Sequence, residues 1–372
     1  MSDPIELAEG ARDRDRDRAR ADVADAAALA EQLRPAVIAA ATACLPLVGR
    51  GDGDALDGAA VAAMRAALAE LPVDGRVVVG EGEKDEAPML HLGERFGRAG
   101  AGDPSIDIAV DPVDGTRLGA AGRPGAMAVI AAAPRGALFD LGPAHYLEKF
   151  VTWLPGLTVA RAAGRSLPEL VAELVEEAAR ARGVEPRDIR IAVQDRPRNL
   201  PYLDAVRAAG ATVERFEHGD IERSLAALPG AAGDAGLDPR PWLPRLDAVI
   251  GVGGAPEGVI VAAAVRALGG SMLARFAPQS DGERERLLGH LAGARAIDAL
   301  VELDELCAGP AAVALAAVTD CEIGLALPGV QQMPRGVRAH WWSAPGGGYG
   351  WADALDVDAG APVPARPEAA GP

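Results

Sequence analysis

Four groups of acidic residues stand where an apolar segment ends or a helical segment begins. Asp111 and Asp114 close an apolar, strand-like segment, and Asp57 precedes a helical one. A further group, residues 81–86 ("EGEKDE"), follows three valines, and Glu257 lies at the start of an apolar helical segment. Carboxylates at the strand ends of an α/β sheet face the crevice in which ligands bind.

Carboxylates that converge in this way repel one another unless a cation lies between them. The set contains no His or Cys, and an all-oxygen ligand set favours hard divalent ions such as Mg²⁺ or Mn²⁺. Two such ions about 3.5–4 Å apart are a common arrangement for phosphoryl transfer to water. One acidic cluster alone is more often a helix cap or a solvated loop. The four together predict a metal site.

The segment "DPVDGT" has the composition of a phosphate-binding turn. Pro112 stiffens the segment so that Asp111 and Asp114 face one pocket, and Gly115 permits close approach of the backbone. Thr116 begins a stretch whose N–H groups are expected to receive a phosphate, while its hydroxyl is expected to orient the attacking water. An ordinary strand followed by a tight turn is the alternative for the same residues.

Helical and strand patterns alternate along the chain and must position these residues. Helices are predicted over 23–48, 57–71, 166–183 and 200–209, and strands over 76–80, 106–111, 125–133, 189–195 and 246–254. With 372 residues, 49% apolar and only 3% aromatic, the chain is predicted to form α/β layers around a core of small side chains.

This length also predicts two domains around a cleft. The predicted parts are a disordered N-terminal extension (1–22), an N-terminal metal-binding α/β lobe (23–155), a C-terminal α/β lobe (156–350) and a disordered tail (351–372).

Charge and cysteine content exclude several classes of protein. A net charge of −17 disfavours binding to nucleic acid or anionic membranes through a general basic surface. The three cysteines are widely spaced and give neither a disulfide framework nor a zinc knuckle. The sequence has no bilayer-spanning apolar run and no apolar core of a signal peptide, so a soluble cytoplasmic protein is expected.

Five ordered motifs resemble class II fructose-1,6-bisphosphatase, a family of the metal-dependent, lithium-sensitive sugar and inositol phosphatases. These motifs are "GRGD…DGAAVAAMR", "VVVGEGEKDEAPML", "DPVDGT", "HYLEK" and "GVGGAPEGV". The resemblance is dense over residues 49–150 and 247–270. It implies a two-lobed, layered αβαβα fold, two divalent cations (Mn²⁺ or Mg²⁺), a small-molecule sugar bisphosphate as substrate, a homo-oligomer and a role in gluconeogenesis.

The resemblance also implies roles for individual residues. Asp57 and Glu81 would bind one cation, and Asp111, Asp114 and Glu257 the other. Thr116 would position the nucleophilic water, with Asp85 close by as a candidate base. The residues implied to meet the substrate are Asp114, Gly115, Thr116, Tyr146, Arg196, Arg198, Gly219, Asp220 and Gly254.

Three positions depart from the family pattern. Gly53 stands where the family typically has a lysine, Arg196 replaces the lysine of a Lys-Pro-Arg segment, and His218 replaces an acid in Asp-Gly-Asp. The leading hypothesis is hydrolysis of the 1-phosphate of fructose 1,6-bisphosphate or of a related bisphosphate such as sedoheptulose 1,7-bisphosphate. The alternatives are a catalytically reduced or silent sugar-phosphate-binding homologue, and a phosphatase for a different sugar or inositol phosphate.

Overall fold

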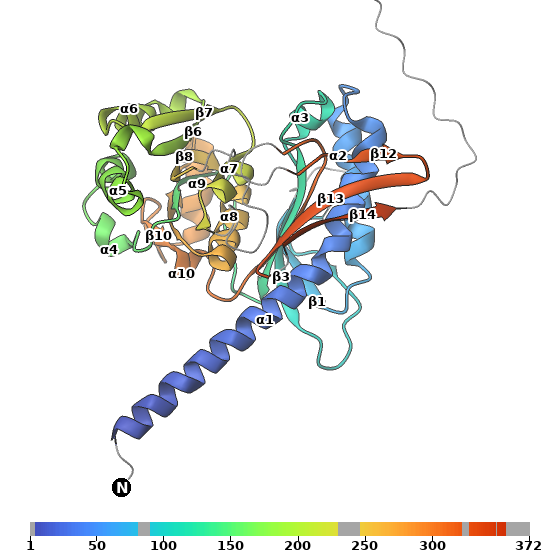
Figure 1. Cartoon of the computed structure of the whole chain (residues 1–372), viewed down its shortest axis with the longest axis horizontal. Coiled ribbons are helices and arrows are strands. Elements are labelled where there is room, and N and C mark those ends of the chain that lie inside the picture. Colours follow the sequence, from blue (N-terminus) through green and yellow to red (C-terminus); the bar gives the residue numbers. More distant parts are fainter. Residues whose placement is uncertain (1–3, 81–89, 230–245, 322–326, 347, 355–372) are drawn as a thin grey trace, which may run out of the picture.

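The computed structural model describes the backbone of residues 4–80, 90–229, 246–321, 327–346 and 348–354, with side chains from residue 22 onward. In these ranges the chain forms two lobes, each built on a mixed β-sheet (Figure 1). Helices cover the outer face of each sheet, and a helical layer lies between the sheets. The predicted α-β-α-β-α order of layers is therefore confirmed.

The first sheet has the strand order β12-β13-β11-β4-β3-β1-β2, and β14 pairs with β13. Its strands are β1 (Asp74–Val79), β2 (Arg95–Phe96), β3 (Ser105–Asp114), β4 (Met127–Pro134), β11 (Ala312–Ala317), β12 (Gln331–Met333), β13 (Gly336–Ala344) and β14 (Gly348–Ala354). Only the β1–β3 pairing is parallel in this described sheet. Helices α1 (Pro4–Cys44) and α2 (Gly53–Leu68) cover its outer face.

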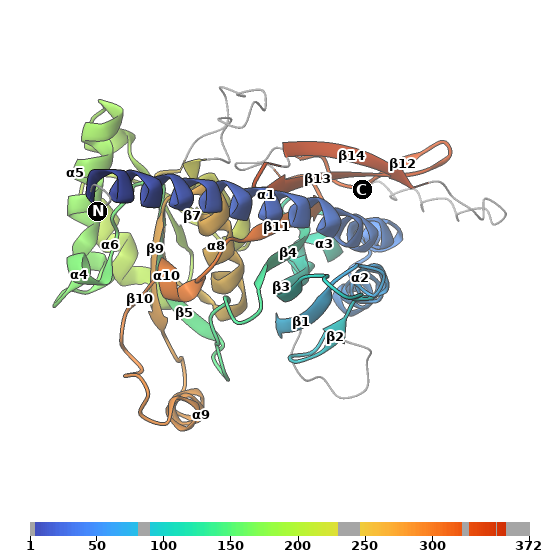
Figure 2. The ribbon, with the colours of Figure 1, turned by 90° about the horizontal axis from the view of Figure 1, so that it is seen from below.

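The second sheet has the strand order β10-β9-β5-β8-β6-β7. Its strands are β5 (Tyr146–Thr152), β6 (Arg190–Gln194), β7 (Thr212–Phe216), β8 (Ala248–Gly254), β9 (Ser271–Phe276) and β10 (Val301–Glu302). Helices α4 (Val159–Ala162), α5 (Leu167–Arg182) and α6 (Leu200–Ala208) cover its outer face. Helix α9 (Asp281–Leu291) stands apart from the layers (Figure 2).

The middle layer consists of α8 (Ala255–Leu268), α7 (Asp220–Ala226) and α10 (Leu303–Leu306). Every residue of α8 from Gly258 to Val265 is buried, as expected for a helix that is apolar on all sides. The helix shares one core with alanines and valines of β4 and β5. Because α8 lies between the two sheets, its first turn lies at the junction of the lobes.

The predicted division into lobes differs from the structure at both ends of the C-terminal lobe. β5 already belongs to the second sheet although it precedes residue 156. Residues 312–354 return to the first sheet, because β11 pairs with β4 and β13 pairs with β11. These pairings join segments far apart in the sequence, so local patterns do not reveal them.

The predicted disordered termini also need correction. Helix α1 begins at Pro4, and its first half projects beyond the body in Figure 1. At the other end, β14 extends to Ala354, and residues 355–372 lie outside the described ranges. None of the described helices has both the length and the apolar character needed to cross a bilayer.

Candidate metal and phosphate site

Three carboxylates from two elements meet at the junction of the lobes. Asp111 and Asp114 come from the end of β3, and Glu257 comes from the first turn of α8. One oxygen from each of them lies within 4.8 Å of the others. We call these three residues the carboxylate trio. The structure thus brings together the residues that the family resemblance assigned to one cation.

A bulge at the end of β3 turns two acidic side chains toward the same edge. Residues three apart in a regular strand face opposite sides of the sheet. Here Asp111 pairs with Val129 of β4 and Asp114 pairs with Met127. Three residues along β3 therefore correspond to only two residues along β4. The Asp111 Oδ1 atom also accepts a hydrogen bond from the Val113 N–H (3.1 Å), which tightens the turn. The extra residue turns both carboxylates toward the same side, with one oxygen of each within 4.8 Å of the other.

Glycines allow the backbone to approach closely around the trio. Gly115 has a φ of +80°, and a Cβ there would lie 2.9 Å from the Gly125 carbonyl oxygen. A Cβ on Gly254 would overlap the carboxylate of Glu257, which lies directly over this residue. Glycine is therefore required at position 115, whereas a side chain at position 254 would displace the Glu257 carboxylate from its present place. The motifs "DPVDGT" and "GGAPEG" thus fix the backbone on which the carboxylates rest.

The electrostatic environment of Asp114 and Glu257 disfavours their ionised forms in the absence of a cation. Burial raises the pKa of Asp114 well above its usual range, and the carboxylates of Glu257, Asp220 and Glu222 raise it further, against the opposing effect of Lys149. Burial likewise raises the pKa of Glu257, with a further contribution from Asp220. A positive charge between these carboxylates would relieve the repulsion.

The oxygen atoms of the trio fit a divalent cation. Asp114 Oδ2 and Glu257 Oε2 are buried, and neither has a hydrogen-bond partner among the described residues. Buried acceptors without a donor are costly. Carboxylate oxygens are the ligands that Mg²⁺ and Mn²⁺ prefer. The trio therefore offers the donor set and the unmet need for positive charge that such a site requires.

Asp57 and Thr116 line a cavity of about 460 Å³ where α2 and α3 (Thr116–Ala120) begin. The Thr116 hydroxyl donates a hydrogen bond to the Val113 carbonyl (2.9 Å). The hydroxyl proton is thus used in this hydrogen bond, and the hydroxyl oxygen is still able to accept a hydrogen bond from a water. Gly53 borders the same cavity, and a Cβ there would lie 3.4 Å from Thr116 Cγ2, an ordinary contact.

Two predicted site residues lie outside the described ranges. Glu81 and Asp85 belong to the segment 81–89, which follows β1. The cation expected between Asp57 and Glu81, and the base expected at Asp85, therefore stay predictions.

Three of the predicted substrate-binding residues lie together beside the trio. Tyr146 of β5 pairs in register with Gly254 of β8, the residue beneath the Glu257 carboxylate. The Arg198 guanidinium lies 4.8 Å from the centre of the Tyr146 ring. Arg198 Nε donates to the Val252 carbonyl at 3.1 Å, which holds the side chain on this strand end. This group presents one cation and one aromatic ring next to the trio.

Arg196 faces a different direction from Arg198. Its guanidinium donates hydrogen bonds to the backbone carbonyls of Asp195 and Glu217, both at 2.9 Å. Burial lowers the pKa of the His218 imidazole, and the positive charge of Arg196 lowers it further. The two arginines of "RPR" therefore serve two separate regions, which their spacing in the sequence does not reveal.

Asp220 is buried and forms an ion pair with Lys149 of β5. The pair lies against Gly253, where a Cβ would overlap the Asp220 carboxylate. Sequence reasoning expected Asp220 to meet the substrate, together with Gly219 before it, and did not single out Lys149. The signal was present, because a lysine inside the buried strand "YLEKFVT" needs a buried partner.

Glu222 is a second charged residue that sequence reasoning did not identify. It is 1% exposed, and its carboxylate lies 3.3 Å from an Arg223 nitrogen. It also contributes to the raised pKa of Asp114. In the sequence it resembles an ordinary helix-surface acid, so only the packing of α7 between the sheets reveals its burial.

The family expected from the motifs is confirmed by comparison with known proteins. Residues 27–343 match the model of a family described as "Bacterial fructose-1,6-bisphosphatase, glpX-encoded". The chain belongs to this family. The five motifs quoted above all lie within the matched range, so this bacterial fructose-1,6-bisphosphatase family covers both lobes.

Individual relatives also carry fructose 1,6-bisphosphatase in their names. Proteins named "D-fructose 1,6-bisphosphatase class 2/sedoheptulose 1,7-bisphosphatase" from Prochlorococcus marinus strains MIT 9313 and MIT 9303 are each 35% identical over 319 residues. In both cases the match covers 82% of this chain and 88% of the relative. A solved extragenic suppressor from Pyrococcus furiosus matches with a TM-score of 0.24 and 18% identity over 50% of this chain and 64% of its own, too little to inform the fold.

Proposed function

We propose that this protein hydrolyses the 1-phosphate of fructose 1,6-bisphosphate or sedoheptulose 1,7-bisphosphate, releasing inorganic phosphate and a sugar monophosphate. The observation that carries the proposal is the carboxylate trio, whose buried acceptors stand beside Arg198 and Tyr146 in a member of the bacterial fructose-1,6-bisphosphatase family. The names of the Prochlorococcus relatives support the choice of these two sugars.

Divalent cations, Mn²⁺ or Mg²⁺, form part of this proposal. Asp111, Asp114 and Glu257 would hold one ion, and Asp57 with Glu81 a second. Bound there, such ions would stabilise charge on the phosphate oxygens and lower the pKa of a water. Two ions rather than one, and the choice of metal, are proposals that a metal titration would test.

The described residues have defined tasks in this reaction. The water oxygen bonds to phosphorus while the bond from phosphorus to the sugar oxygen breaks, and a proton passes to that oxygen. Because the Thr116 hydroxyl donates to Val113, its oxygen accepts from the water and orients a lone pair toward phosphorus. Arg198 and Tyr146 supply a cation and a ring face for the sugar phosphate.

A phosphate-release assay over a panel of sugar phosphates, with Mg²⁺ and Mn²⁺ in parallel, tests the proposal. Release from the two bisphosphates, well above that from monophosphates, is expected. Absence of release from every compound with either metal would refute the enzymatic assignment.

Two variants of one residue sharpen the assay. Thr116→Val removes the hydroxyl at constant size and should lower kcat by about 10–100-fold, the order expected for a lost orienting contact. Thr116→Ser keeps the hydroxyl and should retain most of the activity. Equal activity of the two variants and the unaltered protein would show that Thr116 has no role in the reaction.

A catalytically silent sugar-phosphate-binding protein is the second candidate, and one observation favours it. Gly53 leaves the wall of the Asp57–Thr116 cavity without the lysine that the family typically has there. Calorimetry that detects binding of fructose 1,6-bisphosphate without turnover would favour this candidate over the phosphatase.

Three predictions from the sequence rest on the family resemblance or on composition alone. They are the cytoplasmic location, the homo-oligomer and the place in gluconeogenesis. Light scattering of the purified chain would test the oligomer directly.

A further inference from the structure

The chain contains a single asparagine, Asn199, and its side chain is wholly buried. It is the last residue of η3 (Pro197–Asn199), a short helical turn between β6 and α6. The side-chain amide of asparagine has an acceptor oxygen and two N–H donors, and leaving these groups unpaired in the interior is costly. A buried asparagine on this turn therefore needs several hydrogen-bond partners.

The structure supplies these partners from two neighbouring strands. Asn199 Oδ1 accepts a hydrogen bond from the Val252 N–H (2.8 Å), and Nδ2 donates to the carbonyls of Val252 (3.2 Å) and Gln194 (3.0 Å). Gln194 ends β6 and Val252 belongs to β8, and these two strands pair in parallel. Because the Val252 N–H can only donate, the amide has a single possible orientation. Asn199 therefore ties the turn to both strands.

The same two residues hold the guanidinium of Arg198. Arg198 Nε donates to the Val252 carbonyl and Nη2 donates to Gln194 Oε1, both at 3.1 Å. Asn199 thus binds the backbone of the two residues whose oxygen atoms hold Arg198. Loss of the Asn199 amide would loosen the link between these two anchors and the turn that carries Arg198.

Gly251 allows β8 to approach the asparagine amide directly. This glycine precedes Val252 and has a φ of +136°, and a Cβ there would lie 2.9 Å from Asn199 Oδ1. Residues other than glycine rarely adopt this φ. The close approach makes the position of the turn depend on the amide itself.

A guanidinium that is held in advance favours ligand binding. An arginine side chain has several rotatable bonds, and immobilising it when a ligand binds costs conformational entropy. The described partners of Arg198 are two neutral oxygen atoms and the Tyr146 ring, so they position its charge without neutralising it. An anionic ligand would therefore meet a cation that is already in place.

We propose that Asn199 is a positioning residue, which holds Arg198 in the orientation in which its guanidinium meets a sugar phosphate. Asn199 touches no ligand itself and acts through Arg198 alone. The inference rests on the proposed function, which assigns Arg198 to sugar-phosphate binding, and adds the residue on which this contact depends. Removal of the Asn199 amide should therefore weaken binding only while Arg198 is present.

A double-mutant cycle on the full chain tests the proposal. The probe is fructose 6-phosphate, the monophosphate that the proposed reaction releases from fructose 1,6-bisphosphate, and isothermal titration in Mg²⁺ gives its dissociation constant without turnover. Arg198→Ala should raise this constant by about tenfold or more, as expected for a lost charge-assisted contact. Asn199→Ala should raise it by about three- to tenfold, and should add nothing to Arg198→Ala, because residues that act as a unit are not additive.

Three further variants separate positioning from folding. Asn199→Ser keeps one hydroxyl for the Val252 N–H and takes the place of Asn199→Ala in the cycle if that variant does not fold. Gln194→Ala leaves the buried amide in place but removes one contact to Arg198, so it should raise the dissociation constant by about two- to fivefold. Gln332→Ala is the matched control, because the Gln332 amide also donates to two backbone carbonyls, but on β12 of the first lobe. It should leave the dissociation constant unchanged.

Three results would overturn the role of Asn199. These are a dissociation constant of Asn199→Ala equal to that of the unaltered protein, losses that multiply in the double variant, and an equal loss in Gln332→Ala. A different result would refute the role of Arg198 in the proposed function, and the inference with it. That result is an unaltered protein that does not bind fructose 6-phosphate, or an Arg198→Ala variant that binds it equally well.

Discussion

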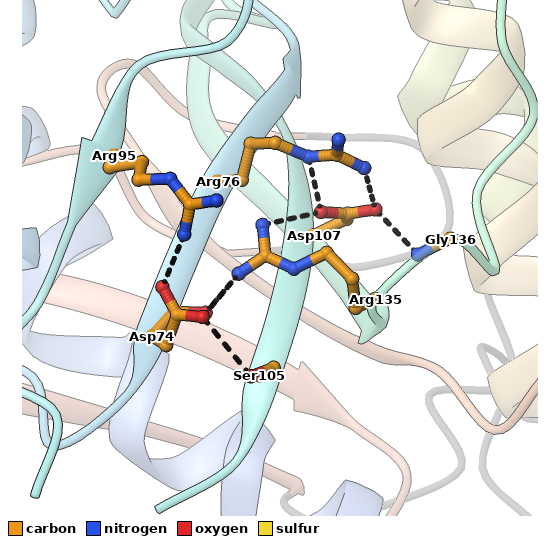
Figure 3. A network of polar contacts seen from close by, with 7 residues as sticks. All are labelled: Asp74, Arg76, Arg95, Ser105, Asp107, Arg135 and Gly136. Carbon is orange, nitrogen blue, oxygen red and sulfur yellow. Dashed lines mark hydrogen bonds and ion pairs between the residues drawn. The ribbon is translucent and has the colours of Figure 1, made fainter.

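The two ends of strand β3 carry buried aspartates in opposite electrostatic settings. At its start, Asp107 is 1% exposed and accepts hydrogen bonds from Arg76 (2.9 and 2.7 Å), Arg135 (3.2 Å) and the Gly136 N–H (2.7 Å) (Figure 3). At its end, Asp114 is 7% exposed and has a buried oxygen without a partner among the described residues.

The pKa values of Asp107 and Asp114 shift in opposite directions. Burial alone would raise the pKa of Asp107, but the hydrogen bonds from Arg76 and Gly136, with the charges of Arg76 and Arg135, lower it below its usual range. Burial and neighbouring carboxylates raise the pKa of Asp114. Asp107, which is surrounded by arginines, thus has a structural role. Asp114, which is surrounded by carboxylates, is available to bind a cation.

The largest expected effect comes from Asp114→Asn. Phosphate release should fall by at least about 100-fold, because even residues behind metal ligands contribute about 10–100-fold. The melting temperature in a chelator should stay equal or rise, since the change removes one of several mutually repelling carboxylates. Turnover assays and thermal unfolding check both. Asp204→Asn, on the exposed surface of α6, is the charge-matched control and should match the unaltered protein in both.

Divalent cations should stabilise the fold through the carboxylates at the end of β3 and not through Asp107 at its start. Mn²⁺ at about 100 times its dissociation constant should add about 2.7 kcal/mol to the free energy of unfolding. Glu257→Gln should lose most of this gain, whereas Asp107→Asn should retain it. Thermal unfolding with and without Mn²⁺ measures the difference. A gain in Glu257→Gln equal to that of the unaltered protein would contradict the assignment of the trio.

Asp107→Asn should lower the free energy of unfolding by about 2 kcal/mol, which is the order of a lost hydrogen bond to a charged group. Because the folded pKa of Asp107 lies below the unfolded value of about 3.9, its contribution is present above that pH. It disappears as the pH falls through the folded pKa. Denaturant unfolding should show a gap between the two proteins at pH 7 that narrows below about pH 4, and a gap independent of pH would argue against this ion pair.

The smallest expected effect comes from Gly53→Lys, which places an additional protein cation near Thr116, just beyond the end of β3. The cavity at Thr116 has room for a side chain at this position. An exposed ionic contact of about 0.5–1 kcal/mol corresponds to a two- to fivefold rise in kcat. Gly53→Ala is the control for the helix itself and should leave kcat unchanged. A rise in both variants would attribute the effect to the helix.

The sequence by itself determined the family, the layered α/β class and most elements. Strand and helix periods, Ser166 as the cap of α5 and Gly183 (φ +66°) at its end are local properties, and the structure confirms them. The motif "DPVDGT" also brings Asp111 and Asp114 close together by itself, because its proline, glycine and paired acids act within a few residues. Such features can be predicted without the tertiary structure because the interactions that specify them join residues close together in the sequence.

Only the tertiary structure decided which charges are neutralised. The spacing of Asp107, Asp111 and Asp114 along β3 does not tell that Arg76 and Arg135 converge on the first, or that Glu257 approaches the other two. Nor does "RPR" tell that Arg196 and Arg198 face separate regions. Coulombic energy depends on distance in space, and the pairings that set these distances join strands and helices remote in sequence.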